Sequence, residues 1–381
     1  MLLAAIVTAP AQAASPRTLA RFISVSGLGD SVSVSVVRLD GSPVYEFKGT
    51  RPRIPASNEK LVTAVAALSE LGAAARVHTV VAAVGEPSGG VVHGSLYLVG
   101  GGDPTLSSAA ITRLARSVKA SGVRRVTGSI VGDETLWDAR RDAPGWKQGF
   151  LGDECPPLSA LTFERNHSGR SASRAAAALL RALRKAGIRV AGTVRAGRAP
   201  AGAAPIALNA SPRVDAMLRT MGKNSDNFTA EMLLKAVGAS AYGRGTTAAG
   251  ARRARQVLRD LGLSLTGSRV VDGSGLSGRD RTTTRLLARL LAAASRTPLI
   301  AGPLRRSLAI AGRDGTLARR MTTGPARGVV RAKTGTLNVS SALSGYAGPY
   351  AFSVIVNGRA VDQTAAQVLQ DRIAQYLARE A

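Results

Sequence analysis

A serine and a lysine three positions apart are the residues of this chain best suited to nucleophilic chemistry. The sequence holds eight lysines against 43 arginines, which indicates that lysine is kept where arginine could not replace it. An ammonium group, unlike a guanidinium, can lose its proton in a protein and act as a base. Ser57-Asn58-Glu59-Lys60 is the one place where a serine stands three residues before a lysine. The apolar pattern predicts a helix over residues 59–71, with Lys60 one turn beyond Ser57 on the same face.

This arrangement favours a negative charge at the serine in two ways. The positive end of the predicted helix dipole lies at Ser57. A desolvated Lys60 can be neutral and take the serine proton. The alternative is an ordinary helix cap followed by a surface lysine, because serine is a common N-cap residue.

A second polar motif, Ser225-Asp226-Asn227, interrupts two helical patterns at residues 214–222 and 228–237. With one residue between them, Ser225 and Asn227 can point into one cleft. Ser225 could then carry a proton, and Asn227 could donate to a substrate carbonyl. The alternative is a polar turn in which Ser225 or Asp226 caps the following helix.

A third motif, Lys333-Thr334-Gly335-Thr336, follows a predicted strand at residues 329–333. A strand edge offers backbone groups to an extended peptide, and Gly335 has no side chain to obstruct it. Lys333 and Thr334 could bind a substrate carboxylate, and the N–H of Thr336 could join that of Ser57 in an oxyanion hole. The alternative is a basic strand end before a glycine turn.

The elements that must position these motifs come from both ends of the chain. Strands are predicted at residues 31–39, 44–48, 342–346 and 351–356 besides the strand at 329–333, and a helix at residues 364–379. The serine–valine alternation of residues 31–39 is typical of a strand with one buried face. Further helices are expected at residues 171–186, 247–261 and 284–294. One sheet assembled from distant segments follows from this order.

The middle of the chain predicts a separate unit. We expect a main domain from residues 14–75 and 206–381, and an inserted domain from residues 76–205. The inserted domain begins with strands at residues 77–84 and 91–99. It ends in an Ala-, Gly- and Pro-rich exit linker at residues 195–205.

Composition limits the partners. The net charge of +27 favours anionic partners, including cell-wall polymers. The arginines are spread along the chain and aromatic residues make up only 4%, which argues against nucleic acid. No apolar run is long enough for a membrane span. The three histidines are scattered and Cys155 is the single cysteine, so we expect no metal, no cofactor and no internal disulfide.

Residues 1–13 predict an export signal remnant. Met1–Val7 is apolar, and Ala11-Gln12-Ala13 has the small-x-small form of a signal-peptidase site. The basic residues that usually precede the apolar stretch are missing, and an ordinary buried segment is the alternative. We therefore expect an exported protein that acts outside the cytoplasm, in the periplasm or at the cell wall.

The three motifs, in this order and context, form the set found in penicillin-binding proteins and serine β-lactamases. The interval of 168 residues from Ser57 to Ser225 leaves room for a large insertion, and 108 residues separate Ser225 from Lys333. The chain resembles the D-alanyl-D-alanine carboxypeptidase/endopeptidase family of class C low-molecular-mass penicillin-binding proteins. The resemblance also rests on residues 101–106, 156–162, 272–277, 310–317 and 343–346.

The resemblance implies a mixed α/β (α+β) transpeptidase-like fold, with an antiparallel sheet of N- and C-terminal strands, a helical subdomain and a smaller inserted domain. It implies a serine-type D-Ala-D-Ala carboxypeptidase, with endopeptidase action open, on peptidoglycan stem peptides. Ser57 would form the acyl-enzyme, also with penicillins, assisted by Lys60, Ser225, Asn227 and Lys333. Thr334, Gly335 and Thr336 would bind substrate.

The sequence departs from the family at two places. Residues 166–170 lead almost directly into the helix at 171–186, so a further small subdomain is predicted to be absent. Gly278 stands where family members have an arginine that grips the stem-peptide side chain, with Arg279 following. Asp133 resembles an acidic residue proposed to hold the amino group of that side chain; a turn residue at a strand end is its alternative.

Two other functions stay open from the sequence. A β-lactamase or esterase on the same fold would deacylate fast, whereas the long insertion favours a polymer substrate. A non-catalytic wall-binding protein would use the charge alone, but the intact set of motif residues argues against it.

Overall fold

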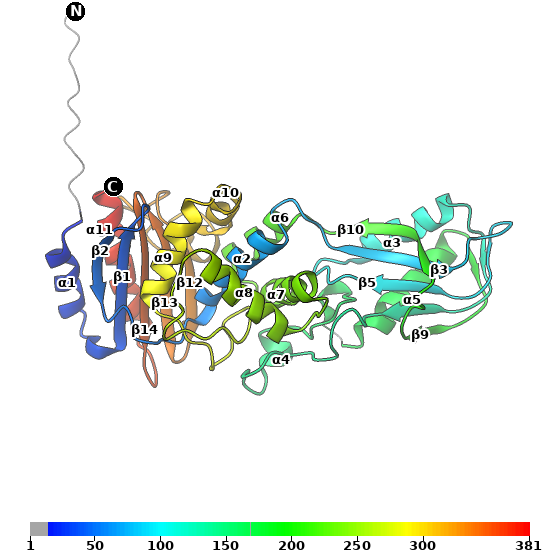
Figure 1. The fold of residues 1–381 in the computed structure, drawn as a ribbon, viewed down its shortest axis with the longest axis horizontal. Coiled ribbons are helices and arrows are strands. Elements are labelled where there is room, and N and C mark those ends of the chain that lie inside the picture. Colours follow the sequence, from blue (N-terminus) through cyan, green and yellow to red (C-terminus); the bar gives the residue numbers. More distant parts are fainter. Residues whose placement is uncertain (1–13, 168) are drawn as a thin grey trace, which may run out of the picture.

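The computed structural model describes residues 14–167 and 169–381. The molecule is elongated, with a six-stranded sheet in one half and a five-stranded sheet in the other (Figure 1). The predicted export signal, residues 1–13, lies outside the described residues. Within the described residues no helix is both long and apolar enough to cross a membrane.

The six-stranded sheet joins the two ends of the chain. Its strands are β1 (Val32–Arg38), β2 (Pro43–Phe47), β11 (Ala309–Ile310), β12 (Arg331–Leu337), β13 (Ser340–Ala347) and β14 (Tyr350–Asn357). They lie in the order β11-β12-β13-β14-β1-β2, and every neighbouring pair is antiparallel. β1 pairs with β14 over its whole length, with Val34 opposite Val354. The predicted α/β fold with an antiparallel sheet of N- and C-terminal strands is confirmed.

Helices cover both faces of this sheet. On one face, α1 (Pro16–Ser24) and α11 (Gln363–Arg379) close an apolar cluster that contains Leu19, Phe352 and Ile373. The other face is covered by α9 (Thr284–Ser295), and the remaining helices on this side extend the same apolar core. These are α2 (Glu59–Glu70), α6 (Val214–Asn224), α7 (Asn227–Tyr242), α8 (Thr247–Asp260) and α10 (Pro298–Ser307), of which α7 and α8 pack on α2.

The burial of β1 corrects the expectation of a strand with one exposed face. Ser33 and Ser35 are fully buried because helices cover both sides of the sheet. Their hydroxyls are paired there: Ser33 Oγ donates to the carbonyl of Lys48, and Ser35 Oγ contacts Thr284 Oγ1, both at 2.9 Å. Local hydrogen bonding thus removes the penalty of burying two hydroxyls.

The second half of the molecule is built on two further sheets. The five-stranded sheet has the order β10-β3-β5-β7-β9, and a three-stranded parallel sheet has the order β4-β6-β8. The strands are β3 (His78–Val84), β4 (Val91–Val92), β5 (Leu96–Gly100), β6 (Arg125–Val126), β7 (Ile130–Asp133), β8 (Arg189–Val190), β9 (Val194–Ala196) and β10 (Ala203–Ala210). The helices are α3 (Ser108–Ala120), α4 (Phe150–Asp153) and α5 (Ser171–Lys185).

Two crossovers place α3 and α5 together. β5, β7 and β9 are parallel neighbours, joined through α3 and then through α5. Because such crossovers are right-handed and both step in the same direction, the two helices lie on one face of the sheet. They pack against each other over a core that includes Leu114 and Leu179.

The exit linker expected at residues 195–205 is partly strand. β10 begins at Ala203, continues to Ala210 and pairs with β3 at the edge of the five-stranded sheet. Its alanines and Pro205 have low strand propensity, so the residue types do not predict this strand. Pro205 is tolerated because the strand is at an edge and the register shifts between residues 205 and 207.

Candidate active site

Ser57 and Lys60 meet where the chain enters α2. Ser57 lies in a 3₁₀ turn, Ala56–Asn58, that runs directly into the helix. Lys60 Nζ lies 2.8 Å from Ser57 Oγ, 2.7 Å from Asn227 Oδ1 and 2.7 Å from the carbonyl oxygen of Ser274. The last two oxygens can only accept. A neutral Lys60 must therefore spend both N–H donors on them, which aims its lone pair at the hydroxyl of Ser57.

The surroundings favour this neutral form. Lys60 is fully buried, and burial lowers the pKa of its ammonium group to about 8. The nearby carboxyl groups of Asp272 and Glu231 act in the opposite direction and limit the fall. The base that the sequence predicts thus has a pKa close to the working pH of most enzymes, which suits general-base catalysis.

We expect the rate of serine acylation to increase with pH up to about 8 and then to level off. Lys60 is neutral only above its pKa, so below it the rate should fall about tenfold for each pH unit. The second-order rate constant for acylation by a chromogenic β-lactam, measured across this range, tests the expectation. A flat profile below the pKa of Lys60 would show that another group accepts the proton.

The second motif combines the two roles that the sequence left open. Ser225 ends α6 in the left-handed conformation, with φ 58°. Asp226 is the N-cap of α7 and accepts from the backbone N–H of Thr229 at 2.7 Å. Asp226 caps the helix, while Ser225 and Asn227 on either side of it line the cleft. A non-glycine residue held at positive φ is a form of strain that often marks functional positions.

Lys333 completes the polar centre from β12. Its Nζ lies 2.9 Å from Ser225 Oγ and 2.8 Å from the carbonyl oxygen of Thr334. The side chain is fully buried, and burial lowers the pKa of its ammonium group well below the usual value, with Lys60 adding repulsion. Because two nearby positive charges repel, protonation of one lysine disfavours protonation of the other. The titrations of Lys60 and Lys333 are therefore coupled.

Gly335 has a packing role that the sequence did not predict, and its substrate role stays a prediction. The sequence predicted that its missing side chain leaves room for substrate. A Cβ atom at Gly335 would lie 2.9 Å from the carbonyl oxygen of Pro55 and 3.2 Å from Cβ of Ala56. The glycine lets the turn that carries Ser57 pack directly on β12. It therefore sets the distance between the serine and the strand.

Gly335→Ala should lower the acylation rate by about 10- to 100-fold, because the added methyl group pushes the turn away from β12 and misplaces the serine. We expect a moderate loss of stability of about 1–3 kcal/mol from the overpacked contact. Gly202→Ala is the matched control, since a Cβ there meets nothing within 4 Å. Acylation kinetics and thermal unfolding check both effects. An equal rate for the two variants would contradict this role.

The strand edge at the third motif is open. The predicted strand ends too early: β12 does not stop at Lys333 but continues through the motif to Leu337. β11 pairs only with Arg331 and Ala332, and no other described strand pairs with residues 333–337 on that side. A cleft of about 800 Å³ lies there. Its lining includes Ser57, Ser225, Asn227, Thr316, Thr334 and Thr336. The structure thus brings the residues of all three motifs together.

The segment between β7 and α5, within the predicted inserted domain, supplies part of the wall of this cleft. The wall residues from this segment are Lys147, Phe150 and Glu154. The carbonyl of Glu154 accepts from Nδ2 of Asn227 at 2.9 Å, which also fixes Oδ1 of Asn227 toward Lys60. Trp146 Nε1 donates to Asp272 of the main domain at 2.9 Å. Residues on both sides of the predicted domain boundary therefore shape the site.

Sequence reasoning missed the groups that hold the Ser274 carbonyl. Glu231 accepts from the backbone N–H groups of residues 273 and 274, at 3.0 and 2.8 Å. Asp272 accepts from those of residues 275 and 277, both at 2.7 Å. Both carboxyl groups are fully buried. They fix the loop whose carbonyl orients Lys60. The helical spacing of Asn227, Glu231 and Lys235, four residues apart, is the signal that could have found this polar face of α7.

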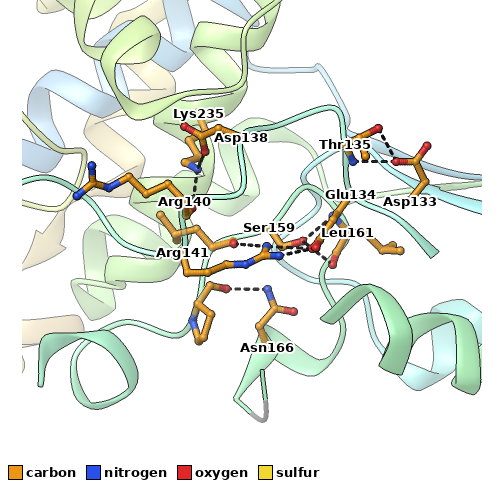
Figure 2. Close-up of polar contacts among 12 residues, drawn as sticks. Asp133, Glu134, Thr135, Asp138, Arg140, Arg141, Ser159, Leu161, Asn166 and Lys235 are labelled. Atoms are coloured by element: carbon orange, nitrogen blue, oxygen red, sulfur yellow. Dashed lines mark hydrogen bonds and ion pairs between the residues drawn. The ribbon is translucent and has the colours of Figure 1, made fainter. Parts of the chain in front are cut away.

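Lys235 anchors the segment that leads from the inserted domain to the cleft (Figure 2). Its Nζ is buried and lies 2.6 Å from Oδ1 of Asp138 and 3.0 Å from the carbonyl of Arg140. Figure 2 shows a second anchor beside it, where Arg141 pairs with Glu134. Arg141 also donates to the carbonyl of Leu158 at 3.0 Å. The scarcity of lysine, which led to Lys60, applies to Lys235 as well.

Asp133 and Arg279 are not brought to the cleft. Asp133, at the end of β7, accepts from the N–H and Oγ1 of Thr135 at 2.8 and 2.7 Å (Figure 2), and from the N–H of Ala199. It lines a separate hollow, whose wall also includes Gly243 at the end of α7. Arg279 is exposed, and its side chain lies along Gly145 near the rim formed by Gly278. The geometry favours the turn role for Asp133, and the substrate roles of both residues stay predictions.

Comparison with known proteins places this site in a family. The sequence model of the D-Ala-D-Ala carboxypeptidase 3 (S13) family matches residues 18–171 and 165–380. The chain belongs to this family. The two matched segments meet where the sequence predicts a missing subdomain. The predictions of class C penicillin-binding protein membership and of a serine-type D-Ala-D-Ala carboxypeptidase are confirmed.

Individual relatives agree with this S13 assignment. The D-alanyl-D-alanine carboxypeptidase of an Actinomadura species is 33% identical over 89% of this chain and 79% of its own length. Carboxypeptidase DacB of Mycolicibacterium smegmatis is 35% identical over 80% of this chain and 70% of its own. Penicillin binding protein 4 of Haemophilus influenzae shares the fold, with a TM-score of 0.83 at 21% identity over 94% of this chain and 99% of that one.

Proposed function

We propose that this S13 peptidase hydrolyses the terminal D-Ala-D-Ala bond of peptidoglycan stem peptides through an acyl-enzyme on Ser57. The observation that carries the proposal is the position of Lys60 Nζ, held by two obligate acceptors with its remaining direction toward Ser57 Oγ. The names of the relatives support the substrate class.

The acylation step follows from this geometry. Lys60 accepts the proton of Ser57 as Oγ attacks the carbonyl carbon of the penultimate D-alanine. The backbone N–H groups of Ser57 and Thr336 receive the developing oxyanion. A proton then passes through Ser225, which lies beside Lys333, to the leaving amine, and D-alanine is released. In deacylation, water takes the place of the amine: it attacks the acyl carbonyl, and its proton passes back to the oxygen of Ser57 as the ester breaks.

The open edge of β12 positions the peptide for this chemistry. An extended stem peptide can add to residues 333–337 as a further strand. Thr334 Oγ1, 2.7 Å from Thr316 Oγ1, and the lysine beside it then face the terminal carboxylate. The same contacts would hold the carboxylate of a penicillin. A solved predatory endopeptidase of Bdellovibrio bacteriovorus is acylated by penicillin G, which supports covalent trapping at Ser57.

Cross-linked muropeptides are a second substrate that we propose. A Bdellovibrio protein of the same fold, with a TM-score of 0.60 and 15% identity, is a peptidoglycan endopeptidase. The predicted loss of one subdomain and the open cleft favour a bulky amine as leaving group. Such substrates exist only outside the cytoplasm, so we also propose that the protein is exported.

Release of D-alanine from a diacetyl-lysyl-D-Ala-D-Ala peptide tests the carboxypeptidase function, and conversion of a cross-linked dimer to monomers tests the endopeptidase function. We expect the first and, with it, a stable penicillin adduct. Rapid penicillin hydrolysis without D-alanine release would instead establish a β-lactamase. Release of neither product would refute the proposal.

A further inference from the structure

We infer that the outer face of α3 and α5 binds a linear phosphodiester polymer of the cell wall. The inference starts from a segregation of charge. Residues 104–132 and 165–214 contain 15 arginines and lysines and not one aspartate or glutamate. These two segments form α3, α5 and the short strands that follow them. They supply 15 of the 27 net positive charges of the chain.

The fold gathers these charges on one surface. α3 and α5 lie side by side on the same face of the five-stranded sheet and bury their apolar residues toward it. Six basic residues are exposed on the outward side of the two helices: Arg113, Arg116, Arg174, Arg181, Arg184 and Lys185. In the part of the chain that the structure describes, no carboxylate pairs with any of them. We call these six residues the basic face.

Folding stability accounts for only part of this placement, because Arg184 and Lys185 alone lie in the last turn of α5, where the helix dipole favours a cation. Like charges three or four residues apart repel along a helix, as Arg181 does with Arg184 and Lys185. Arg174 lies in the first turn of α5, where the helix dipole disfavours a cation. Beside the helices, Arg125 of β6 stands directly opposite Arg189 of β8. Each arrangement costs electrostatic free energy in the isolated protein. A bound polyanion would make the same arrangement favourable.

The chemistry of the face points to a phosphate polymer. Five of its six members are arginines, whose planar guanidinium fork fits phosphate oxygens in pairs. Neither helix carries an aromatic side chain on which nucleic acid bases could stack. None of the large exposed hydrophobic residues lies on α3 or α5, so the face has no apolar anchor for a membrane. A flexible phosphodiester chain needs neither feature.

The position of the basic face suits a wall enzyme. α3 and α5 lie in the half of the molecule away from the six-stranded sheet, whereas the cleft lies on the edge of that sheet (Figure 1). A polymer held there would keep the enzyme at the wall without entering the cleft. The choice of a wall polymer rests on the proposed function, but the binding surface does not.

Binding to purified poly(glycerol phosphate), measured at increasing salt, tests the inference. The variant carries Arg181→Gln, Arg184→Gln and Lys185→Gln, and its control carries Arg219→Gln, Arg259→Gln and Arg289→Gln, three exposed arginines of the main domain with the same total charge change. We expect the first set to lower affinity at least about tenfold and to reduce the salt slope by about 2 to 3. The control should change affinity about twofold or less.

Three outcomes would overturn the inference. Equal losses in both sets would show that the net charge acts diffusely. No loss in either set would remove the basic face from binding. Binding to phosphatidylglycerol vesicles, without binding to the soluble polymer, would assign the face to a membrane. D-alanine release should be unchanged in both sets, and its absence in the wild-type protein would refute the proposed function without touching the binding result.

Discussion

Ser57→Ala should abolish covalent trapping of benzylpenicillin and lower D-alanine release by at least about 10⁴-fold. Among the described contacts of Lys60 Nζ, the hydroxyl of Ser57 is the one group that the lone pair can deprotonate, and the variant removes it. Intact mass after incubation with the drug measures the first effect. The wild-type protein should gain the mass of one drug molecule, and the variant should gain none.

The substitution is structurally mild, which makes the result specific. Ser57 Oγ contacts only Lys60 Nζ among the described hydrogen bonds, and the residue is partly exposed to the cleft. Thermal unfolding should therefore match the wild type closely. Ser225→Ala is the comparison within the same site: it should slow acylation but still allow the adduct to form. An adduct of one drug molecule on Ser57→Ala would show that a different side chain is acylated.

Lys60→Arg should lower the acylation rate by about 10³-fold or more, although it keeps the positive charge. A guanidinium stays protonated at any pH that the protein tolerates, so it cannot accept the serine proton. Its larger planar group must also fit a fully buried position that three oxygen atoms now surround. Rapid mixing with a chromogenic β-lactam measures the acylation rate directly.

The pH profile separates loss of the base from loss of packing. If Lys60 is the base, the residual rate of Lys60→Arg should no longer rise with pH toward about 8. Lys185→Arg, an exposed lysine on α5, is the matched control and should leave the rate and the profile unchanged. A wild-type profile in Lys60→Arg at any reduced rate would assign the ionisation to another group.

That the three motifs lie in one cleft was predictable from the sequence. Most of the buried residues that position the motif side chains were not. Motif order and local pattern were enough to place Ser57, Ser225 and Lys333 in one cleft. The buried carboxyl groups of Glu231 and Asp272 were not found, because their role depends on backbone N–H groups of a loop that local pattern does not place. The role of Lys235 was not predictable either, because its partners Asp138 and Arg140 lie about 95 residues away in the sequence.

The errors and omissions have physical causes as well. The packing role of Gly335 is not predictable, because the sequence shows the missing side chain but not the neighbour that needs the space. The alternation in β1 indicates which residues share a face, but not that α9 covers the face with the serines. β10 was read as a linker because alanine and proline carry little strand propensity, while its pairing with β3 decides its structure.

The pairing of β1 with β14 determines when the active site can form during synthesis and folding of the chain. On one side β1 pairs with the nearby residues 43–47, but on its other side residues 32–38 pair with residues 350–356, and the turn that holds Ser57 packs on Gly335. The inserted domain, by contrast, pairs its strands within residues 78–210 and could fold early. A chain still emerging from the ribosome cannot align Ser57 with β12. The hydrolase therefore stays inactive until its last strands have arrived.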